Sequence, residues 1–561
     1  MEGWEFPGFG DYHRTMSVEK EELRVAEDTV RTRGGTEKLN ELEATAISGN
    51  DILSSCLYVS SQVTESAGIL APVCLTIVAA ILWIYKGIYG EAISAISMNG
   101  GSYNLLINTS TKPVAALAAC LAVISYIATG VVSATTAVVY LQVLVPAVPL
   151  IGGIVLLHFF FAVLNAWGIG DSAKVAVFIF ILHLCVLVMF VILGVVYMVF
   201  SGGGHLQENF YTHYPDASVA DETVEGNTFS ALYFGTCAGM LGVSGFESSS
   251  QFVESQGPGV FVKTLRNMWI GVVVFNPVIS LVSLSVLPLE DVKAAHGSLL
   301  AVVADHAGNW LQDAIADMSD WVPRVSSSEY TLGQVLQFIV CVDAFIVLCG
   351  AVLTSYVGIN GLACRMASDR VLPEFLLNRN RWRNTTHNTA LIFFLLSALQ
   401  VAILKGDVDG LSGVYSFAFL GVMIAFGVGT IMLKFKRPSL PREVTVSFAA
   451  ACFGVVLVVC TFLGTLMGKS VYVSYFSFYL IGVGAVIIIM FQRVRLLRLL
   501  YVAMRSVFPN SAFANLKALI SKLRSGPMLF YAKHPDLYVL NKAVLYVRDN
   551  EQSNELLIVH V

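Results

Sequence analysis

Long apolar runs alternate with short polar loops over most of this 561-residue chain. A helix needs about 20 mostly apolar residues to cross the hydrocarbon core of a bilayer. The pattern therefore predicts an all-α membrane protein with twelve transmembrane helices. The predicted spans are 46–66, 68–97, 113–146, 150–168, 172–200, 228–255, 267–288, 332–361, 388–405, 410–433, 445–467 and 472–492.

Charge is scarce within these runs and concentrated outside them. Only 13% of the residues are charged, 56% are hydrophobic, and the mean hydropathy is +0.71, whereas soluble proteins are roughly 25% charged. Residues 44–492 hold 42 of the charged side chains. This balance excludes a soluble enzyme, a disordered chain and a receptor with one span. No basic face is concentrated enough to predict a nucleic-acid partner.

The distribution divides the chain into three parts. Residues 1–44 form an acidic N-tail that we expect to be disordered, 45–492 form the twelve-span domain, and 493–561 form a C-terminal segment. In that segment, 493–524 is predicted to be a basic amphipathic helix lying on an anionic membrane surface. Short strand and helix pieces are predicted to follow, at 527–532, 537–547 and 556–561.

Basic residues in the loops predict the orientation. With the N-terminus in the cytosol, the inner loops hold 13 Lys and Arg residues and the outer loops hold 4. The positive-inside rule then places both termini in the cytosol. Asn108 and Asn384 lie in glycosylation sequons, but on the cytosolic side, so we expect both to be unmodified. Whether the membrane is the plasma membrane or that of an organelle stays open.

The ten cysteines lie within or at the ends of apolar runs. This placement predicts small packing residues and neither a disulfide framework nor a metal site. The sequence also predicts no cofactor and no catalytic residue, because it contains no hydrolase or metalloprotease motif.

Two spans contain residues that interrupt a helix. The first carries Gly49, Asn50, Asp51, Ser54 and Ser55, and the sixth reads Gly-Met-Leu-Gly-Val-Ser-Gly-Phe-Glu over 239–247. In a membrane, non-helical backbone persists where protein or a water-filled cavity satisfies it. Paired interrupted spans in two five-helix halves are typical of an inverted-repeat secondary transporter. The alternative is that these small residues let helices pack closely.

Four stretches in this order resemble the amino acid–polyamine–organocation superfamily. They are Ser54-Ser55-Cys56-Leu57-Tyr58, Tyr89-Gly90-Glu91-Ala92 with Asn99-Gly100-Gly101-Ser102-Tyr103, Gly245-Phe246-Glu247, and Arg365-Met366-Ala367-Ser368-Asp369-Arg370-Val371-Leu372-Pro373. The resemblance implies the leucine-transporter-type fold, with a 5+5 inverted repeat and two added helices. It also implies transport of amino acids, polyamines or related amines by alternating access. Residues 540–551 resemble the start of a regulatory domain carried by some relatives.

The resemblance implies a substrate site at the two interrupted spans. A substrate carboxylate would bind backbone N–H groups at Ser54, Ser55 and Cys56, since a half-helix N-terminus favours negative charge. The sixth-span residues would contribute carbonyls and the side-chain pocket: Gly242, Val243, Ser244 and Gly245. Leu241 lies where some relatives carry a gating aromatic, which Tyr58 and Phe246 could replace; both could equally pack in the core or face lipid.

Eight ionisable residues lie within the predicted spans: Asp51, Lys86, Glu91, His158, His183, Glu247, Glu254 and Asp343. Such residues are costly in a membrane and often functional. Glu247, Lys86 and Asp343 are candidates for gating or internal charge pairing. Glu91 and Glu254 lie near the predicted cytosolic face, where we expect them to be solvated or to form a gate.

His183 is the candidate switch for a coupling ion. The resemblance implies a lysine at this place in relatives, which occupies the position of a sodium ion. Histidine changes charge near physiological pH, which suits proton coupling, with Asp51 as its candidate partner. Alternatively, His183 is a packing residue, and Thr354 and Ser355 supply hydroxyls to a sodium site.

The sequence therefore predicts a secondary active amino acid transporter, with H⁺ as the coupling ion, membrane lipid as its surroundings, and a homo-oligomer as a possible assembly. A polyamine or organic cation transporter, coupled to Na⁺ or working as an exchanger, is the alternative. A nutrient sensor that does not transport is an alternative of another class.

Overall fold

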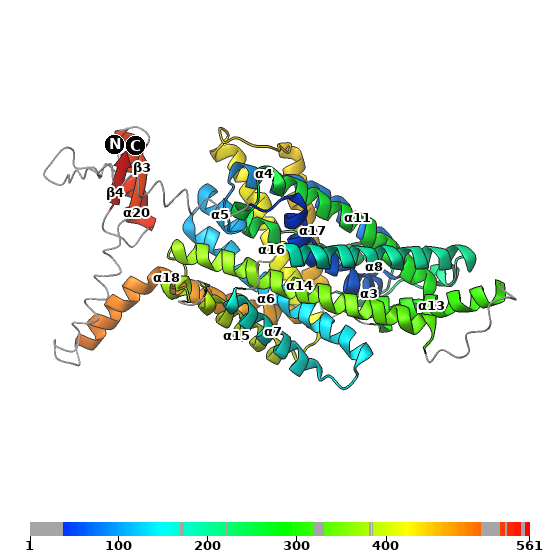
Figure 1. Ribbon diagram of the computed structural model, residues 1–561. Coiled ribbons are helices and arrows are strands. Elements are labelled where there is room, and N and C mark those ends of the chain that lie inside the picture. Colours follow the sequence, from blue (N-terminus) through cyan, green and yellow to red (C-terminus); the bar gives the residue numbers. More distant parts are fainter. Residues whose placement is uncertain are drawn as a thin grey trace. The chain divides into compact units, whose positions relative to one another are not determined.

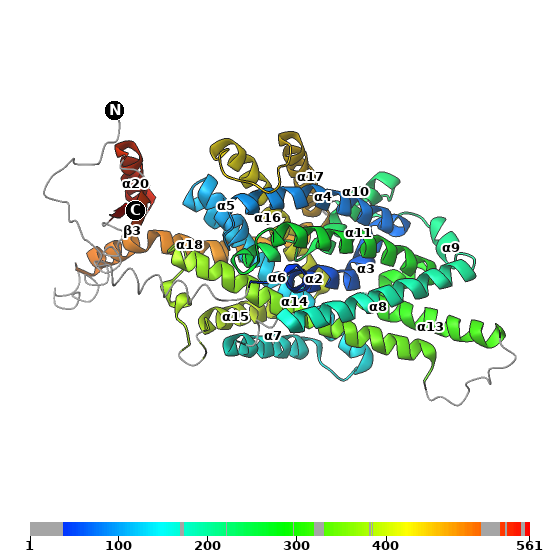
Figure 2. The ribbon, with the colours of Figure 1, turned by 45° about the horizontal axis from the view of Figure 1, so that its top comes forward.

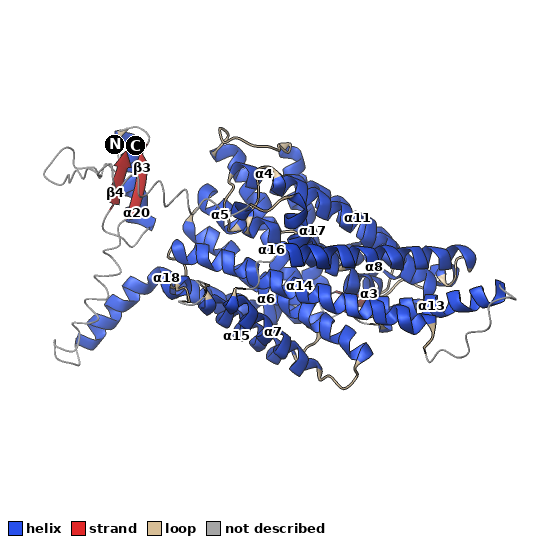
Figure 3. Cartoon of the chain, viewed as in Figure 1, coloured by secondary structure: helices blue, strands red, loops and turns tan. Residues whose placement is uncertain are grey.

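Helices make up most of the computed structural model of this protein (Figures 1 and 3). The structure describes residues 38–168, 173–219, 222–295, 297–318, 330–380, 383, 385–505, 528–532, 536–550 and 556–560. The predicted N-tail, apart from its last residues, lies outside them. Residues 38–484 form one compact unit, and a second unit contains the chain from 485 onward.

The first unit is mostly helical, with short 3₁₀ turns (η) between some helices and one two-stranded hairpin; its last helix, α18, continues past residue 484 into the second unit. The elements up to the end of the loop that follows the fifth span are α2 (Glu41–Ser54), α3 (Cys56–Ala67), η1 (Gly68–Leu70), α4 (Ala71–Ala95), α5 (Gly101–Thr109), α6 (Lys112–Leu144), α7 (Leu150–Trp167), α8 (Ala173–Phe200), α9 (Leu206–Phe210), β1 (Ala217–Val219) and β2 (Glu222–Val224). The following elements are α10 (Thr228–Gly239), η2 (Met240–Val243), η3 (Ser248–Gln251), η4 (Val253–Ser255), α11 (Val260–Val286), α12 (Leu289–Ala294), α13 (Leu299–Met318), α14 (Leu332–Ser368), η5 (Glu374–Leu377), α15 (His387–Leu404), α16 (Val408–Lys436), α17 (Phe448–Gly468) and α18 (Ser470–Arg505).

Eleven helical segments within the described residues are long and apolar enough to cross a membrane. The first of them, Glu41–Ala95, is 55 residues long and contains the first two predicted spans. At 1.5 Å per residue, a helix of that length is far longer than a bilayer is thick. Gly68, with φ of +56°, ends α3 and turns the chain through η1 into α4. The all-α membrane fold is confirmed, whereas the count of twelve spans stays a prediction.

The helix α2 lies at the centre of the first unit. It packs against α8, α11 and α14, while α6 packs against α14 and α16, and Figure 2 shows α2 enclosed among α8, α11 and α14. On α7, α8, α17 and α18, many large apolar side chains are exposed. Such a surface is what lipid contact requires, since the bilayer interior is apolar. The central position of α2 places the predicted substrate residues inside the bundle.

Two elements lie where no structure was predicted. The segment 201–227 contains an antiparallel hairpin, in which Ala217 pairs with Val224. After α11, the helix α13 packs against α14 and α8. It is 20 residues long, but it is not among the segments apolar enough to span a membrane. The sequence analysis missed this helix because it searched for long apolar runs, and α13 contains too many polar residues to form one.

The C-terminal unit contains a parallel βαβ arrangement. Strands β3 (Met528–Ala532) and β4 (Leu556–His560) pair in parallel through the crossover helix α20 (Leu537–Asn550). They lie close to the three ranges where short strand and helix pieces were predicted. The basic helix expected at 493–524 is described only to Arg505, where it continues α18 without a break; residues 506–527 lie outside the described part. A regulatory role for this unit stays a prediction.

Candidate functional site

The expected break in the first span is confined to one residue. Ser55 separates α2 from α3, but its backbone angles, φ −63° and ψ −25°, are helical. Its N–H still bonds to the carbonyl of Ile52. The prediction of a broad interruption here is therefore wrong, because Ser54 and Ser55 bond back to carbonyls of their own helix, Asp51 and Ile52, and keep the helical course.

The break in the sixth span is extensive. The helix α10 ends at Gly239, and the chain continues through short turns to Ser255. Gly245 has φ of +79°, a left-handed conformation that residues with a Cβ atom rarely adopt. A Cβ atom there would lie 2.5 Å from Cγ of Asp51. Glycine at this position thus permits both the turn and the close approach of the first span.

The two spans meet at their interruptions through side-chain hydrogen bonds. The hydroxyl of Ser55 donates to the Gly242 carbonyl at 2.9 Å, and the Tyr58 and Ser244 hydroxyls lie 3.1 Å apart. The Asn276 amide also donates to the Gly242 carbonyl, at 3.1 Å, and its oxygen accepts from the Cys56 thiol at 2.8 Å. The Gly242 carbonyl, freed by the break, is thereby satisfied by polar groups of the first and seventh spans.

The predicted substrate residues are brought together and buried. They are Ser54, Ser55, Cys56, Tyr58, Leu241, Gly242, Val243, Ser244, Gly245 and Phe246. Asn276 was missed by the sequence analysis. It precedes Pro277 inside an apolar span, and a proline in a membrane helix frees a carbonyl that neighbouring polar groups must satisfy. That pair was the signal that could have identified it.

His183 is paired with Asp343, and the predicted pairing with Asp51 is wrong. The Nδ1 atom of His183 lies 2.7 Å from Oδ2 of Asp343, and the two side chains are 0% and 4% exposed. Its Nε2 atom lies 3.4 Å from the Leu53 carbonyl oxygen. Asp51 instead accepts a hydrogen bond from the Ser248 hydroxyl at 2.8 Å. The reason is that Asp51 faces the sixth-span break, whereas His183 meets α2 at Leu53, the residue before its last.

The hydroxyls of Thr354 and Ser355 point to different carbonyls. Thr354 donates to Gly350 at 3.0 Å and lies 3.4 Å from the Ile47 carbonyl of α2. Ser355 donates to Ala351 in its own helix, at 3.1 Å. Thr354 therefore lies at the contact of the first and eighth spans, as expected for a sodium site, while the Ser355 hydroxyl is engaged within α14.

The remaining charges separate into different places. Glu247 is buried beside Gln251, whose amide lies 3.4 Å from its carboxylate. Lys86 is not brought to the site, since its ammonium lies 3.4 Å from the centroid of the Trp83 ring in a cation–π contact. The Trp83 ring itself is half exposed. The Trp83 ring thus stabilises the Lys86 charge at the outside of the bundle, and Lys86 does not pair with Glu247.

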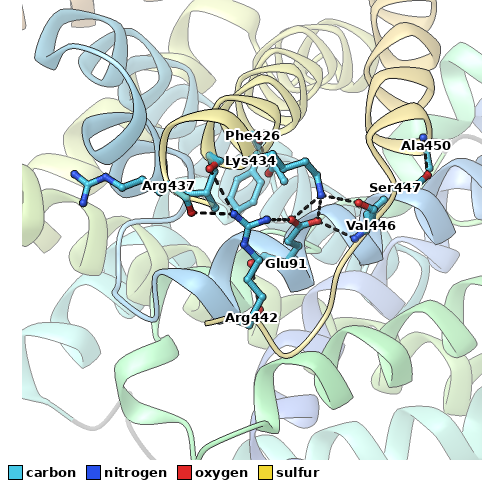
Figure 4. Close-up of polar contacts among 11 residues, drawn as sticks. Glu91, Phe426, Lys434, Arg437, Arg442, Val446, Ser447 and Ala450 are labelled. Atoms are coloured by element: carbon cyan, nitrogen blue, oxygen red, sulfur yellow. Dashed lines mark hydrogen bonds and ion pairs between the residues drawn. The ribbon is translucent and has the colours of Figure 1, made fainter. Parts of the chain in front are cut away.

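Glu91 is buried and ion-paired, so the expectation of a solvated carboxylate is wrong (Figure 4). Its oxygens lie 2.5 Å from Nζ of Lys434 and 2.5 Å from Nη1 of Arg442. The N–H of Val446 also donates to it, at 2.8 Å. Glu91 therefore fastens the end of α16 and the following loop to α4.

The predicted cytosolic ends of the interrupted spans are also joined. Backbone groups of Leu39 bond to the Ser255 carbonyl at 2.8 Å and to the Gly257 N–H at 3.0 Å. Glu254 exchanges two hydrogen bonds with Asn99, and its side chain is exposed, as expected. In the part of the chain that the structure describes, no three His, Cys, Asp or Glu side chains form a group that could hold a metal ion.

Comparison with known proteins relates this arrangement to a family. Residues 39–491 match the family described as Amino acid permease, while no curated protein matches the chain. Among solved structures, the chain is similar to the Eremococcus coleocola manganese transporter in complex with an aromatic bis-isothiourea substituted compound. The identity is 13% and the TM-score 0.43, over 80% of this chain and 92% of that one. A histidine-to-alanine mutant of that transporter matches at 13% identity and a TM-score of 0.44, over the same shares.

The family match covers both interrupted spans and the His183–Asp343 pair, and it extends over nearly all of the membrane part. It confirms the resemblance and the transporter fold, and it identifies a permease and not an enzyme. The chain therefore belongs to the amino acid permease family of multi-pass membrane transporters.

Proposed function

We propose that this transporter moves amino acids by alternating access and is driven by protons. The observation that carries the proposal is the buried pair of His183 and Asp343, at 2.7 Å. Buried ionisable groups in a membrane protein are costly, and they mark ion pathways and proton relays. This pair joins two spans directly beside the span that carries the predicted substrate residues.

The pair links protonation to the position of α2. A protonated imidazole donates from both ring nitrogens, whereas a neutral one donates from a single nitrogen. Protonated His183 can therefore bond to Asp343 and to the Leu53 carbonyl together, which holds α2 against α8 and α14. Neutral His183 loses one of the two bonds. Proton binding would thus stabilise one position of the first span. A substrate that binds better to that position would then bind more tightly when His183 is protonated.

Sodium coupling is the second candidate for the driving ion. It is favoured by Thr354, whose hydroxyl lies 3.4 Å from the Ile47 carbonyl across the contact of α14 and α2. A sodium site needs several further oxygens, and the Ser355 hydroxyl already donates within its own helix. We prefer the proton because His183 and Asp343 are already in direct contact, at 2.7 Å, whereas a sodium site would need further oxygen ligands.

The test measures uptake of radiolabelled amino acids into proteoliposomes at several external pH values. Wild-type uptake should increase with an inward proton gradient and persist when choline replaces Na⁺. His183→Gln should reduce uptake by about tenfold and flatten the pH profile, since coupling effects of about 5- to 150-fold are typical. His205→Gln is the matched control, because His205 forms an exposed pair with Glu208 at 3.1 Å.

An unchanged pH profile in His183→Gln would contradict proton coupling. If uptake is lost when choline replaces Na⁺, sodium and not the proton is the driving ion. If the folded protein binds amino acids but moves none of them, the non-transporting sensor is the better explanation.

A further inference from the structure

Two buried carboxylates, Asp51 of the first span and Glu247 of the sixth, lie at the sixth-span break without a basic partner. Asp51 is 2% exposed and Glu247 is 5% exposed. Among the described residues, no Lys, Arg or His side chain forms an ion pair with either of them; the cations that are paired contact other acids. Asp51 Oδ1 has no hydrogen-bond partner. Ionised carboxylates buried in this way are strongly unfavourable unless a cation compensates them.

Three buried tyrosines from other helices are close enough to interact electrostatically with these acids. Tyr89 of α4 interacts with Glu247, and Tyr126 of α6 and Tyr415 of α16 interact with both acids. The hydroxyls of Tyr89 and Tyr415 are buried and lack hydrogen-bond partners. Each of these hydroxyls is therefore free to accept a hydrogen bond from a ligand.

The aromatic rings around this centre are held firmly. Tyr89 stacks on Phe426 with ring centroids 3.8 Å apart, and meets Phe246 edge-on at 5.6 Å. Aromatic faces attract cations, and ammonium groups in particular. An ammonium group also offers three N–H donors, which match unpartnered carboxylate and hydroxyl oxygens.

We propose that Asp51 and Glu247, together with the buried hydroxyls of Tyr89 and Tyr415, bind the ammonium group of a cationic substrate. The inference rests on the proposed function, since it assumes that the interrupted spans hold the substrate, and it narrows the substrate class to alkylammonium compounds with a net positive charge. Two ionised carboxylates carry two negative charges; a neutral zwitterion adds no net positive charge, whereas a dibasic amino acid adds one and a diamine adds two. Asp51 lies one helical turn before Ser54, so a dibasic amino acid and a diamine both satisfy the chemistry.

The experiment measures ligand binding to the full-length purified protein by thermal unfolding and calorimetry. The probes are 1,4-diaminobutane, L-lysine, L-leucine, sodium chloride and choline chloride at equal ionic strength. The diamine, L-lysine or both should raise the unfolding temperature at concentrations where L-leucine and the two salts do not. Preference between the first two probes separates the two sources of the ammonium group.

Variants connect the binding to the centre. Asp51→Asn and Glu247→Gln should each weaken binding of the preferred cation by about tenfold or more, as expected when a hydrogen bond to a charged group is lost. Glu222→Gln, an exposed acid in β2, should leave the affinity unchanged. Tyr415→Phe keeps the ring and removes the hydroxyl, so it tests the site even if Asp51→Asn does not fold.

Equal stabilisation by L-leucine and L-lysine would overturn the proposal, as would unchanged affinity in E247Q and Tyr415→Phe. Stabilisation by sodium chloride that E247Q abolishes would also overturn it, in favour of an inorganic cation. The two proposals can fail independently. Cation binding without transport would contradict only the proposed transport function. Transport of neutral amino acids without cation binding would contradict only this inference.

Discussion

Glu91, His183 and Asp51 are buried ionisable residues with different surroundings. The Glu91 carboxylate is contacted by two cations and a backbone N–H. Two positive charges therefore face a single negative charge. His183 has one carboxylate, at 2.7 Å, and its state can change with a single proton. Asp51 has a serine hydroxyl and no cation. The surroundings of Glu91 therefore suit a structural ion pair, those of His183 suit a proton-dependent switch, and those of Asp51 suit binding of a charged ligand.

Glu91→Gln should destabilise the protein by about 3 kcal/mol. The amide removes the negative charge and leaves Lys434 and Arg442 mostly buried without a counterion, and breaking a buried pair costs about 3–5 kcal/mol. The measurement is the midpoint temperature of thermal unfolding in detergent.

Glu443→Gln is the control for Glu91→Gln, since it makes the same exchange at an exposed position of the same loop. If both variants unfold at the wild-type temperature, the ion pair does not hold the α16–α17 loop to α4.

At the scale of elements, the two interrupted spans differ in how much backbone they free. The first remains helical through Ser55, whereas the sixth loses its helix from Gly239 to Ser255. They are tied to one another at the Tyr58–Ser244 hydroxyl contact and, through Leu39, at the other end of the break. Alternating access would require these ties to open in turn, because both together enclose the centre of the bundle.

Gly245→Ala should abolish substrate binding and lower stability by about 1–3 kcal/mol. The positive φ of +79° strains any residue with a Cβ atom, and the new methyl group would collide with Asp51. Binding measured by calorimetry and thermal unfolding would report the two effects separately.

Gly482→Ala is the matched exchange, within α18, where a Cβ atom meets nothing within 4 Å. It should be neutral or slightly stabilising, because alanine favours helix. Normal binding in Gly245→Ala would show that the turn tolerates a side chain and does not shape the site.

At the scale of the molecule, the proposed orientation follows from charge alone. Basic residues predominate in the loops predicted to be cytosolic, including that of Glu443, and the β1–β2 hairpin lies in a loop of the opposite side. Neither the orientation nor the oligomeric state follows from the arrangement of helices, because a bundle inserted either way has the same internal contacts.

Cysteine labelling in intact cells should determine the orientation. Glu222→Cys, in the hairpin, should react with a membrane-impermeant maleimide from outside, and Glu443→Cys should react only after permeabilisation. The unsubstituted chain measures labelling of the native cysteines. The reverse pattern would mean that the positive-inside count misassigned the topology.

Much of the candidate site was predictable from residue types. Gly245, Ser244 and Gly242 mark the sixth-span break because glycine and serine interrupt helices, and His183 and Asp343 were conspicuous because charges are rare in membrane spans. The partners were not predictable. His183 and Asp343 are 160 residues apart, and Glu91 is 343 residues from Lys434; such pairings depend on how helices rotate and pack, which local pattern does not specify.

The sequence by itself determined that this is an all-α membrane protein and that two of its apolar runs carry interrupting residues, since lipid requires long apolar helices and penalises free backbone. Only the tertiary structure decided that the first span stays nearly continuous, that Asp343 and not Asp51 meets His183, and that two buried acids are left without a basic partner. Those outcomes depend on which faces of distant helices meet, and packing selects them.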